Sequence, residues 1–130
     1  MVIETSALVA IFLDEPERAA FARLILAADR RLISAVSKLE AGMVAIGRNG
    51  LAGRSRLDAI LRELAVAVVP FDEDQADIAR DAFARYGKGR HRAGLNFGDC
   101  AAYALAIAEA EPLLFKGTDF GSTDVEIVTP

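Results

Sequence analysis

Apolar residues along the chain fall into two kinds of segment. Short apolar runs alternate with longer segments in which apolar residues recur every three or four positions, which is typical of buried strands and of the helices that cover them. The pattern predicts strands at residues 1–3, 31–35, 66–71, 112–117 and 125–128. It predicts helices at residues 6–13, 16–28, 36–48, 53–65, 72–87 and 99–111, with Gly50 near the end of the third helix.

This alternation of strands and helices indicates the fold class. Strands that alternate with helices form a mostly parallel sheet with helices packed on its faces. We therefore expect a single α/β domain over residues 1–130, built as a sandwich around a central sheet. In such folds the functional sites lie at the carboxyl ends of the strands, so an acidic residue directly after a strand is a candidate for a site.

Composition and charge narrow the class further. The chain is 53% hydrophobic and 26% charged over 130 residues, which suits a folded domain with its own core. A net charge of −4 argues against nucleic-acid binding through overall positive charge, although a local basic patch is compatible with it. No apolar stretch reaches the roughly 18 residues of a membrane span, and no secretory signal is recognisable. With Cys100 as the single cysteine, we expect a cytoplasmic protein without an internal disulfide.

Four carboxylates occupy candidate positions. Glu4 follows the first predicted strand, Glu40 lies in the helix after the second, Asp99 begins the last helix, and Asp119 follows the fourth strand. Taken singly, Asp99 can be a helix cap, Glu40 an exposed helix acid and Asp119 a turn residue. Glu4 is the hardest to explain in this way, because glutamate is a poor residue for capping a helix N-terminus.

Taken together, the four acids indicate a divalent metal ion. Two carboxylates about 4 Å apart repel each other by roughly 4 kcal/mol at an effective dielectric near 20, so a cluster requires a cation or raised pKa values. Carboxylate oxygens suit Mg²⁺ or Mn²⁺, whereas a single histidine, His91, poorly supports a zinc site or a histidine-based triad. A metal held in this way activates water and stabilises displacement at phosphorus, so we expect hydrolysis of a phosphodiester.

A basic segment precedes Asp99. Its cationic residues are Arg85, Lys88, Arg90 and Arg92, with Tyr86 and Phe97 close in sequence. A solvated loop explains this composition as well as a functional role does. In the functional interpretation, the cations contact RNA phosphates and the aromatic rings stack on unpaired bases.

Four sequence segments follow one another in an order typical of a known family. They are "MVIETSALVAIFLDEP", "SAVSKLEAG", "RYGKGRHRAGLNFGDCAAYALA" and "LLFKGTDFGSTDV". The chain resembles PIN-domain proteins, specifically VapC-type toxins. The resemblance implies a three-layer α/β/α sandwich and an endoribonuclease that depends on Mg²⁺ or Mn²⁺ and acts on tRNA or other structured RNA. It also implies a homodimer and a VapB-type antitoxin, whose C-terminal segment lies across the active-site groove and through which alone the complex binds operator DNA.

The resemblance also assigns roles to individual residues. Glu40, Asp99 and Asp119 match the acidic positions of the family, and with Glu4 they form the expected catalytic set. Three of these acids, Glu4, Asp99 and Asp119, are the expected metal ligands. The expected supporting residues are Thr5, Ser6, Asn96 and Asp124. We expect a hydroxyl of this set to orient a carboxylate or a metal-bound water.

Glu4 departs from the family pattern, which has aspartate at this position. The additional methylene moves the carboxylate oxygens by roughly 1.5 Å. Mg²⁺ demands near-ideal octahedral geometry, and a misplacement of about 1 Å can reduce a rate on the order of 100-fold. Three explanations stay open: a natural glutamate accommodated by the backbone, a natural glutamate that weakens the nuclease, and a substitution introduced so that a toxic protein can be produced. The otherwise intact motifs favour the third.

Two other functions compete with a nuclease. The first is a PIN-fold module that binds antitoxin or RNA without cutting. The second is a receiver domain, in which Asp72 would accept a phosphoryl group and Lys116 would assist. A receiver needs paired acids after the first strand, however, and Glu4 has no acidic neighbour.

Overall fold

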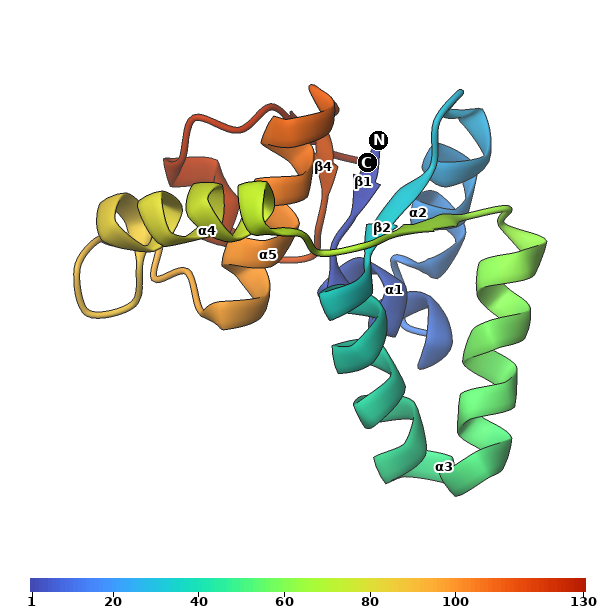
Figure 1. Ribbon diagram of the computed structural model, residues 1–130. Coiled ribbons are helices and arrows are strands. Elements are labelled where there is room, and N and C mark those ends of the chain that lie inside the picture. The colour runs from blue at the N-terminus through green and yellow to red at the C-terminus, as the bar shows by residue number, and fades with distance from the viewer.

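The computed structural model describes residues 1–130 as short strands and helices around one sheet (Figure 1). The strands are β1 (Val2–Ile3), β2 (Leu32–Ser34), β3 (Ala67–Val69), β4 (Leu113–Leu114) and β5 (Ile127–Val128). The helices are α1 (Thr5–Phe12), α2 (Arg18–Ala27), α3 (Ala35–Glu63), α4 (Glu73–Tyr86) and α5 (Phe97–Glu109), with a 3₁₀ helix, η1 (Asp119–Ser122), after β4. Every predicted strand is present, although each is shorter than its apolar run.

The sheet has the strand order β3-β2-β1-β4-β5, and every neighbouring pair is parallel. Val2 of the central strand lies opposite Leu32 of β2 and Leu113 of β4. Parallel neighbours require crossover connections, which the helices provide. The predicted α/β class with a parallel central sheet is confirmed.

Successive residues of each inner strand point to opposite faces of the sheet, as strand geometry requires. Ile3, Ile33 and Leu114 pack with α1, α2 and α3. Their sequence neighbours, Val2, Leu32 and Leu113, pack on the other face with α4 and α5. Figure 1 shows these two helical layers on opposite sides of the strands, so the three-layer sandwich is confirmed.

Helix α3 is a hairpin of two helical arms that extends away from the sheet (Figure 1). The chain turns at Asn49 and Gly50, whose backbone angles are not helical, and Gly50 has a positive φ of 61°. The arms approach closely at Gly53, where a Cβ atom would lie 2.1 Å from the carbonyl oxygen of Ala45. The predicted helices at residues 36–48 and 53–65 are these two arms.

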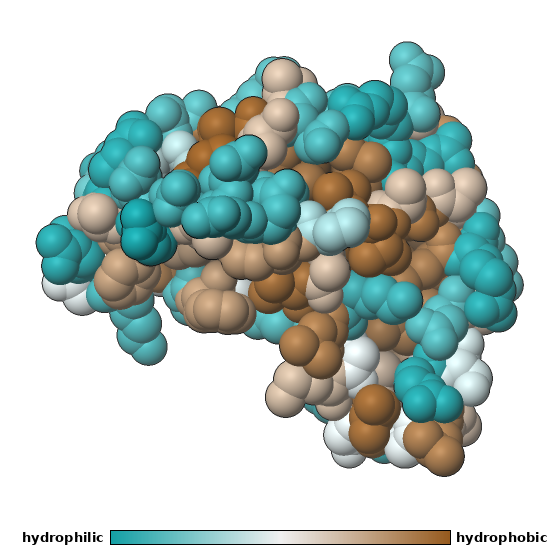
Figure 2. All heavy atoms as spheres, in the orientation of Figure 1, coloured by the Kyte–Doolittle hydropathy of each residue, from teal (hydrophilic) through white to brown (hydrophobic).

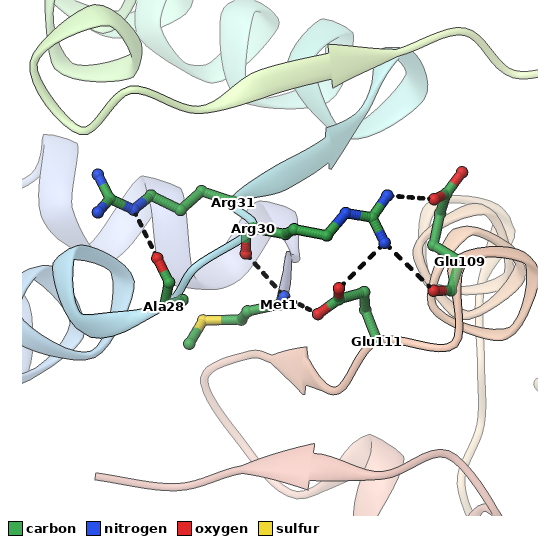
Figure 3. A network of polar contacts seen from close by, with 6 residues as sticks. All are labelled: Met1, Ala28, Arg30, Arg31, Glu109 and Glu111. Carbon is green, nitrogen blue, oxygen red and sulfur yellow. Dashed lines mark hydrogen bonds and ion pairs between the residues drawn. The ribbon is translucent and has the colours of Figure 1, made fainter.

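Polar contacts link the segments at the amino ends of the strands to one another (Figure 3). The α-amino group of Met1 donates to the carbonyl oxygen of Arg30 at 2.8 Å and forms an ion pair with Glu111. Arg30 in turn forms ion pairs with Glu109 and with Glu111, the latter at 3.1 Å. These contacts join the start of β1 to the segments that lead into β2 and β4.

The opposite, carboxyl ends of the strands lead into polar residues. Glu4 follows β1, Ser34 ends β2 and caps α3, and Lys116 lies two residues after β4. Because the helix of a parallel crossover runs back along the sheet, the N-terminus of α5 lies at this same edge. None of the helices combines the length and the apolar composition that crossing a bilayer requires.

Candidate active site

A cleft of about 340 Å³ lies at the carboxyl ends of β1 and β4. It is lined by Glu4, Thr5, Ser6, Val9, Glu40, Asn96, Asp99, Phe115, Lys116, Asp119 and Phe120. All four predicted catalytic acids and three of the four predicted supporting residues are therefore brought together. The cleft contains four carboxylates and one cationic side chain, which is Lys116.

Glu4 both caps α1 and lines the cleft. Its backbone N–H donates to the carbonyl oxygen of Leu114 at 2.9 Å, which continues the pairing of β1 with β4. Its Oε2 atom accepts hydrogen bonds from the Ser6 backbone N–H at 2.7 Å and from the Ser6 hydroxyl. The sequence presented a helix cap and a site residue as alternatives for Glu4, and in the structure one side chain both caps α1 and lines the cleft.

Burial makes the ionised forms of two acids costly. Glu4 is only 5% exposed, and burial raises its pKa to about 7, against the hydrogen bonds from Ser6. The charges of Asp99 and Glu40 raise the Glu4 pKa further. Burial also raises the pKa of Asp99, and the nearby charges of Asp119 and Glu40 act in the same direction. A cation in the cleft would relieve this repulsion.

Glu40 is half-buried and comes from the first arm of α3. Its Oε1 atom accepts a hydrogen bond from the Thr5 hydroxyl at 2.8 Å. The carboxylate passes over Gly98, where a Cβ atom would lie 2.0 Å from Oε1 of Glu40. Gly98 is not among the site residues predicted from the sequence. The signal available was a glycine in the first turn of a helix, a position that commonly has a packing or functional reason.

Asp99 is held by a reciprocal capping arrangement at the start of α5. Asn96 caps the helix, and its Oδ1 atom accepts from the Asp99 N–H at 2.9 Å. The Asp99 carboxylate accepts from the Asn96 N–H through Oδ2 at 3.0 Å. The expectation that Asp99 begins the helix was wrong by two residues, because the helix starts at Phe97 with Asn96 as its cap.

The donor set of the cleft suits a hard divalent cation, since it consists of carboxylate oxygens without a neighbouring cysteine or histidine ligand. As the side chains stand, no three acidic, histidine or cysteine residues are grouped closely enough to hold an ion together. The geometry explains why: the carboxylates of Glu4 and Glu40 are turned toward Ser6 and Thr5. The residues fit a divalent metal through the chemistry of their carboxylate oxygens.

Asp124 lies outside the cleft. Its carboxylate accepts hydrogen bonds from Arg85 at 3.0 Å and from the Tyr103 hydroxyl at 2.7 Å, and both bonds lower the pKa of Asp124. Arg85 also donates to the Tyr86 hydroxyl at 2.6 Å. Asp124 thus joins the C-terminal segment to α4 and α5 and does not line the cleft.

The other cations of the predicted RNA-binding segment lie on an exposed loop. Arg90 donates to the carbonyl oxygen of Ala84 at 3.3 Å, whereas Lys88 and Arg92 are exposed and take part in none of the ion pairs. None of the three lines the cleft. Lys116, which does line it, had been considered only for the receiver interpretation.

Comparison with known proteins identifies the family. The PIN domain family pattern matches residues 1–126. "Ribonuclease VapC30" of Mycobacterium tuberculosis is 51% identical over 128 residues, which covers 98% of each chain. "Ribonuclease VapC" of Mycolicibacterium smegmatis is 52% identical, with 98% of this chain and 99% of that one covered. The chain belongs to the PIN-domain family and, within it, to the VapC ribonucleases.

Solved structures agree on the fold. The M. tuberculosis toxin VapC20, described as cleaving the sarcin-ricin loop, has a TM-score of 0.79 at 18% identity and covers 99% of this chain and 98% of its own. VapBC2 from Rickettsia felis, solved with a DNA fragment from its promoter, has a TM-score of 0.78 at 16% identity, with coverages of 98% and 96%. At these identities the likeness shows the fold alone.

Proposed function

We propose that this chain is the toxin of a toxin–antitoxin pair and an Mg²⁺- or Mn²⁺-dependent endoribonuclease that hydrolyses tRNA or other structured RNA. The observation that carries the proposal is the cleft, where four carboxylates from four separate segments meet one lysine. The relatives that match over nearly their full length are named ribonucleases, and this supports the proposal.

The acids of the cleft and the residues that hold them have separate roles in this proposal. Glu4, Asp99 and Asp119 would hold the divalent ion, which when bound supplies Lewis acidity and a water of lowered pKa. Glu40, positioned by the Thr5 hydroxyl, would orient the attacking water. Ser6 and Asn96 hold the carboxylates of Glu4 and Asp99 in place through the hydrogen bonds described above.

Cleavage of a labelled tRNA pool with Mg²⁺ or Mn²⁺ tests the proposal. The chain and its Asp99→Asn variant are each produced with antitoxin and then stripped of it. We expect the variant to lose on the order of 100-fold or more in rate, whereas its fold stays intact because the Asn amide oxygen can still accept from Asn96. Equal cleavage by both proteins would remove Asp99 from the mechanism. If no RNA offered is cut, the binding module without cleavage becomes the better explanation.

Glu4→Asp tests the unusual acid separately. Aspartate is a good helix cap, so α1 should be retained. We expect the aspartate form to cut on the order of 100-fold faster if the length of Glu4 misplaces its oxygens. Equal turnover and equal metal affinity in calorimetry would mean that Glu4 is a working ligand.

The structure argues against the receiver alternative. Asp72 caps α4, and its Oδ1 atom accepts from the Gln75 N–H at 2.9 Å. It follows β3, an edge strand of the sheet, and is not among the residues that line the carboxylate cleft. Lys116 and Asp72 therefore do not share a site.

An exposed apolar stripe beside the cleft supports an antitoxin partner. Leu39, Met43 and Ile46 lie on one face of the first arm of α3, and Leu39 and Met43 are 63% and 65% exposed. The stripe begins one residue before Glu40, and Figure 2 shows apolar side chains on the arms of α3. A VapB-type antitoxin that covers this stripe would reach the cleft and would supply the DNA binding that a net charge of −4 disfavours. Met43→Glu should weaken copurification with antitoxin, whereas Leu26→Glu on α2 should not.

A groove between α4 and α5 supports a homodimer. Phe71, Phe83 and Phe97 form its walls, and its floor consists of alanines and Cys100. Helix α4 begins with acidic residues and ends next to the basic residues 85–92, so the α4 helices of two copies packed antiparallel about a two-fold axis would match opposite charges. We expect a dimer in light scattering and a monomer for Phe97→Glu.

A further inference from the structure

Lys116 is fixed next to the acidic cluster by its backbone. Its N–H donates to the Ser6 hydroxyl oxygen at 2.8 Å, and its carbonyl oxygen lies 3.2 Å from the same hydroxyl oxygen. Ser6 also donates to Glu4, so a single hydroxyl joins Lys116 to the buried acid. The position of Lys116 in the cleft is thereby determined independently of its side chain.

The side chain of Lys116 is turned to the rim of the cleft. Its Nζ atom forms ion pairs with Glu15 and with Glu17, the latter at 3.3 Å, both from the connection between α1 and α2. All three side chains are between 31% and 39% exposed. Ion pairs between solvated side chains are weak and exchange readily for other partners.

The charge balance of the cleft favours such an exchange. RNA brings one negative charge per phosphate to a cleft that already holds four carboxylates. The cations of residues 85–92 lie outside the cleft lining, and Arg85 is already paired with Asp124. Lys116 is therefore the one protein cation in the cleft lining that is placed to meet a phosphate next to the acids.

We propose that Lys116 is a substrate-positioning residue that exchanges Glu15 and Glu17 for a phosphate of the bound RNA. The inference rests on the proposed ribonuclease function. A contact of this kind forms equally in the ground state and the transition state, so its loss raises KM and leaves kcat unchanged. The two glutamates compete with the RNA, so their removal strengthens binding.

The experiment compares four variants: Lys116→Gln, Glu15→Gln/Glu17→Gln, the triple variant, and Arg18→Gln as a control. Arg18 pairs with Asp14 at 2.7 Å on the same connection and does not line the cleft. Steady-state cleavage of the labelled tRNA pool gives kcat and KM. Fluorescence anisotropy of the same RNA, in an Asp99→Asn background with EDTA, gives Kd between 50 and 200 mM KCl, an interval over which phosphate contacts change affinity strongly.

We expect Lys116→Gln to raise KM and Kd by about 5-fold and to reduce the salt slope by about 0.7, the value for one phosphate contact on a single strand. The glutamate double variant should lower Kd, and the triple variant should match Lys116→Gln alone, because the competition acts only through the lysine. Arg18→Gln should change none of these quantities.

Three results would overturn the inference. An unchanged KM, Kd and salt slope for Lys116→Gln would leave the lysine a purely structural link. A lower kcat at constant KM would place Lys116 in the chemical step instead. An equal gain in affinity on removing the glutamates, with or without Lys116, would show that they act through overall charge. If the unaltered chain binds RNA but cuts none, the ribonuclease proposal fails while the salt slope still tests Lys116.

Discussion

The two ends of the central sheet gather acidic residues in opposite ways. At the amino end, Glu109 and Glu111 meet Arg30 and the α-amino group of Met1 in a matched network (Figure 3). At the carboxyl end, four carboxylates line one cleft, and its single lysine is paired with other acids at the rim. The residue types are alike, and only the placement of cations differs.

The pKa shifts follow this difference. The hydrogen bond from the Met1 amine lowers the pKa of Glu111, whereas burial raises the pKa of Glu4 to about 7. The amino end therefore stabilises the folded chain, and the carboxyl end costs it stability. Groups whose pKa values are shifted against stability are typical of functional sites, and this supports the cleft as the candidate site.

The largest expected effect is on Glu4. Its pKa rises from 4.5 to about 7 on folding, so the folded chain holds a proton that the unfolded chain releases above pH 4.5. Stability therefore falls as the pH rises from 4.5 to 7, by about 3 kcal/mol. Glu4→Gln keeps an oxygen that can accept from Ser6, and we expect it to be more stable than the chain at pH 8 by up to this amount. Urea unfolding of both proteins in EDTA at pH 5 and pH 8 measures this difference in the free energy of unfolding. A difference of the same size at both pH values would contradict the expectation.

Glu111→Gln should show the opposite trend at the other end of the sheet. It replaces the charged partner of a largely buried amine by a neutral amide oxygen, and we expect a loss of about 1 to 2 kcal/mol at pH 7 because hydrogen bonds between charged groups are stronger than those to neutral ones. Because the pKa of Glu111 is lowered from 4.5, its contribution is fully present above pH 4.5 and is lost as the pH falls through the lowered value. A difference from the unaltered chain that grows on acidification would reverse the sign we assign.

Gly98→Ala separates activity from stability within the cleft. The new methyl group would meet the end of a flexible side chain, the carboxylate of Glu40, at 2.0 Å, so Glu40 must move while the backbone can stay. We expect a change in stability within about 1 kcal/mol and a loss of cleavage of about 10-fold. Gly47→Ala is the matched control, because nothing lies within 4 Å of its Cβ position and it should leave cleavage unchanged. Full activity of the Gly98 variant would show that the position of Glu40 is not critical.

Arg30→Gln should have the smallest effect. Its side chain is half-exposed, and its ion pairs with Glu109 and Glu111 are screened by water. We expect an unfolding midpoint close to that of Arg23→Gln, an exposed arginine outside the network. A loss greater than that of Glu111→Gln would mean that Arg30, rather than the Met1 amine, holds the amino end together.

Much of the site was predictable from particular residues. Glu4, Asp119 and Lys116 were recognisable because acidic and basic residues follow short apolar runs, and parallel strands end at one edge. The start of α5 was placed two residues late, although Asn96 and Asp99 have the spacing of a capping pair. Gly98 was not predicted, because it is the packing of Glu40 from α3 against α5 that leaves no room for a side chain at this position.

The sequence by itself determined the class of fold, the parallel order of strand and helix, and the set of candidate acids, because periodicity and residue type are local properties of the chain. Only the tertiary structure decided which side chains meet. It turned Glu4 toward Ser6 and Glu40 toward Thr5, paired Asp124 with Arg85 away from the cleft, and left Lys116 as the one cation among the acids. These outcomes depend on contacts between segments far apart in the chain, and no local pattern encodes them.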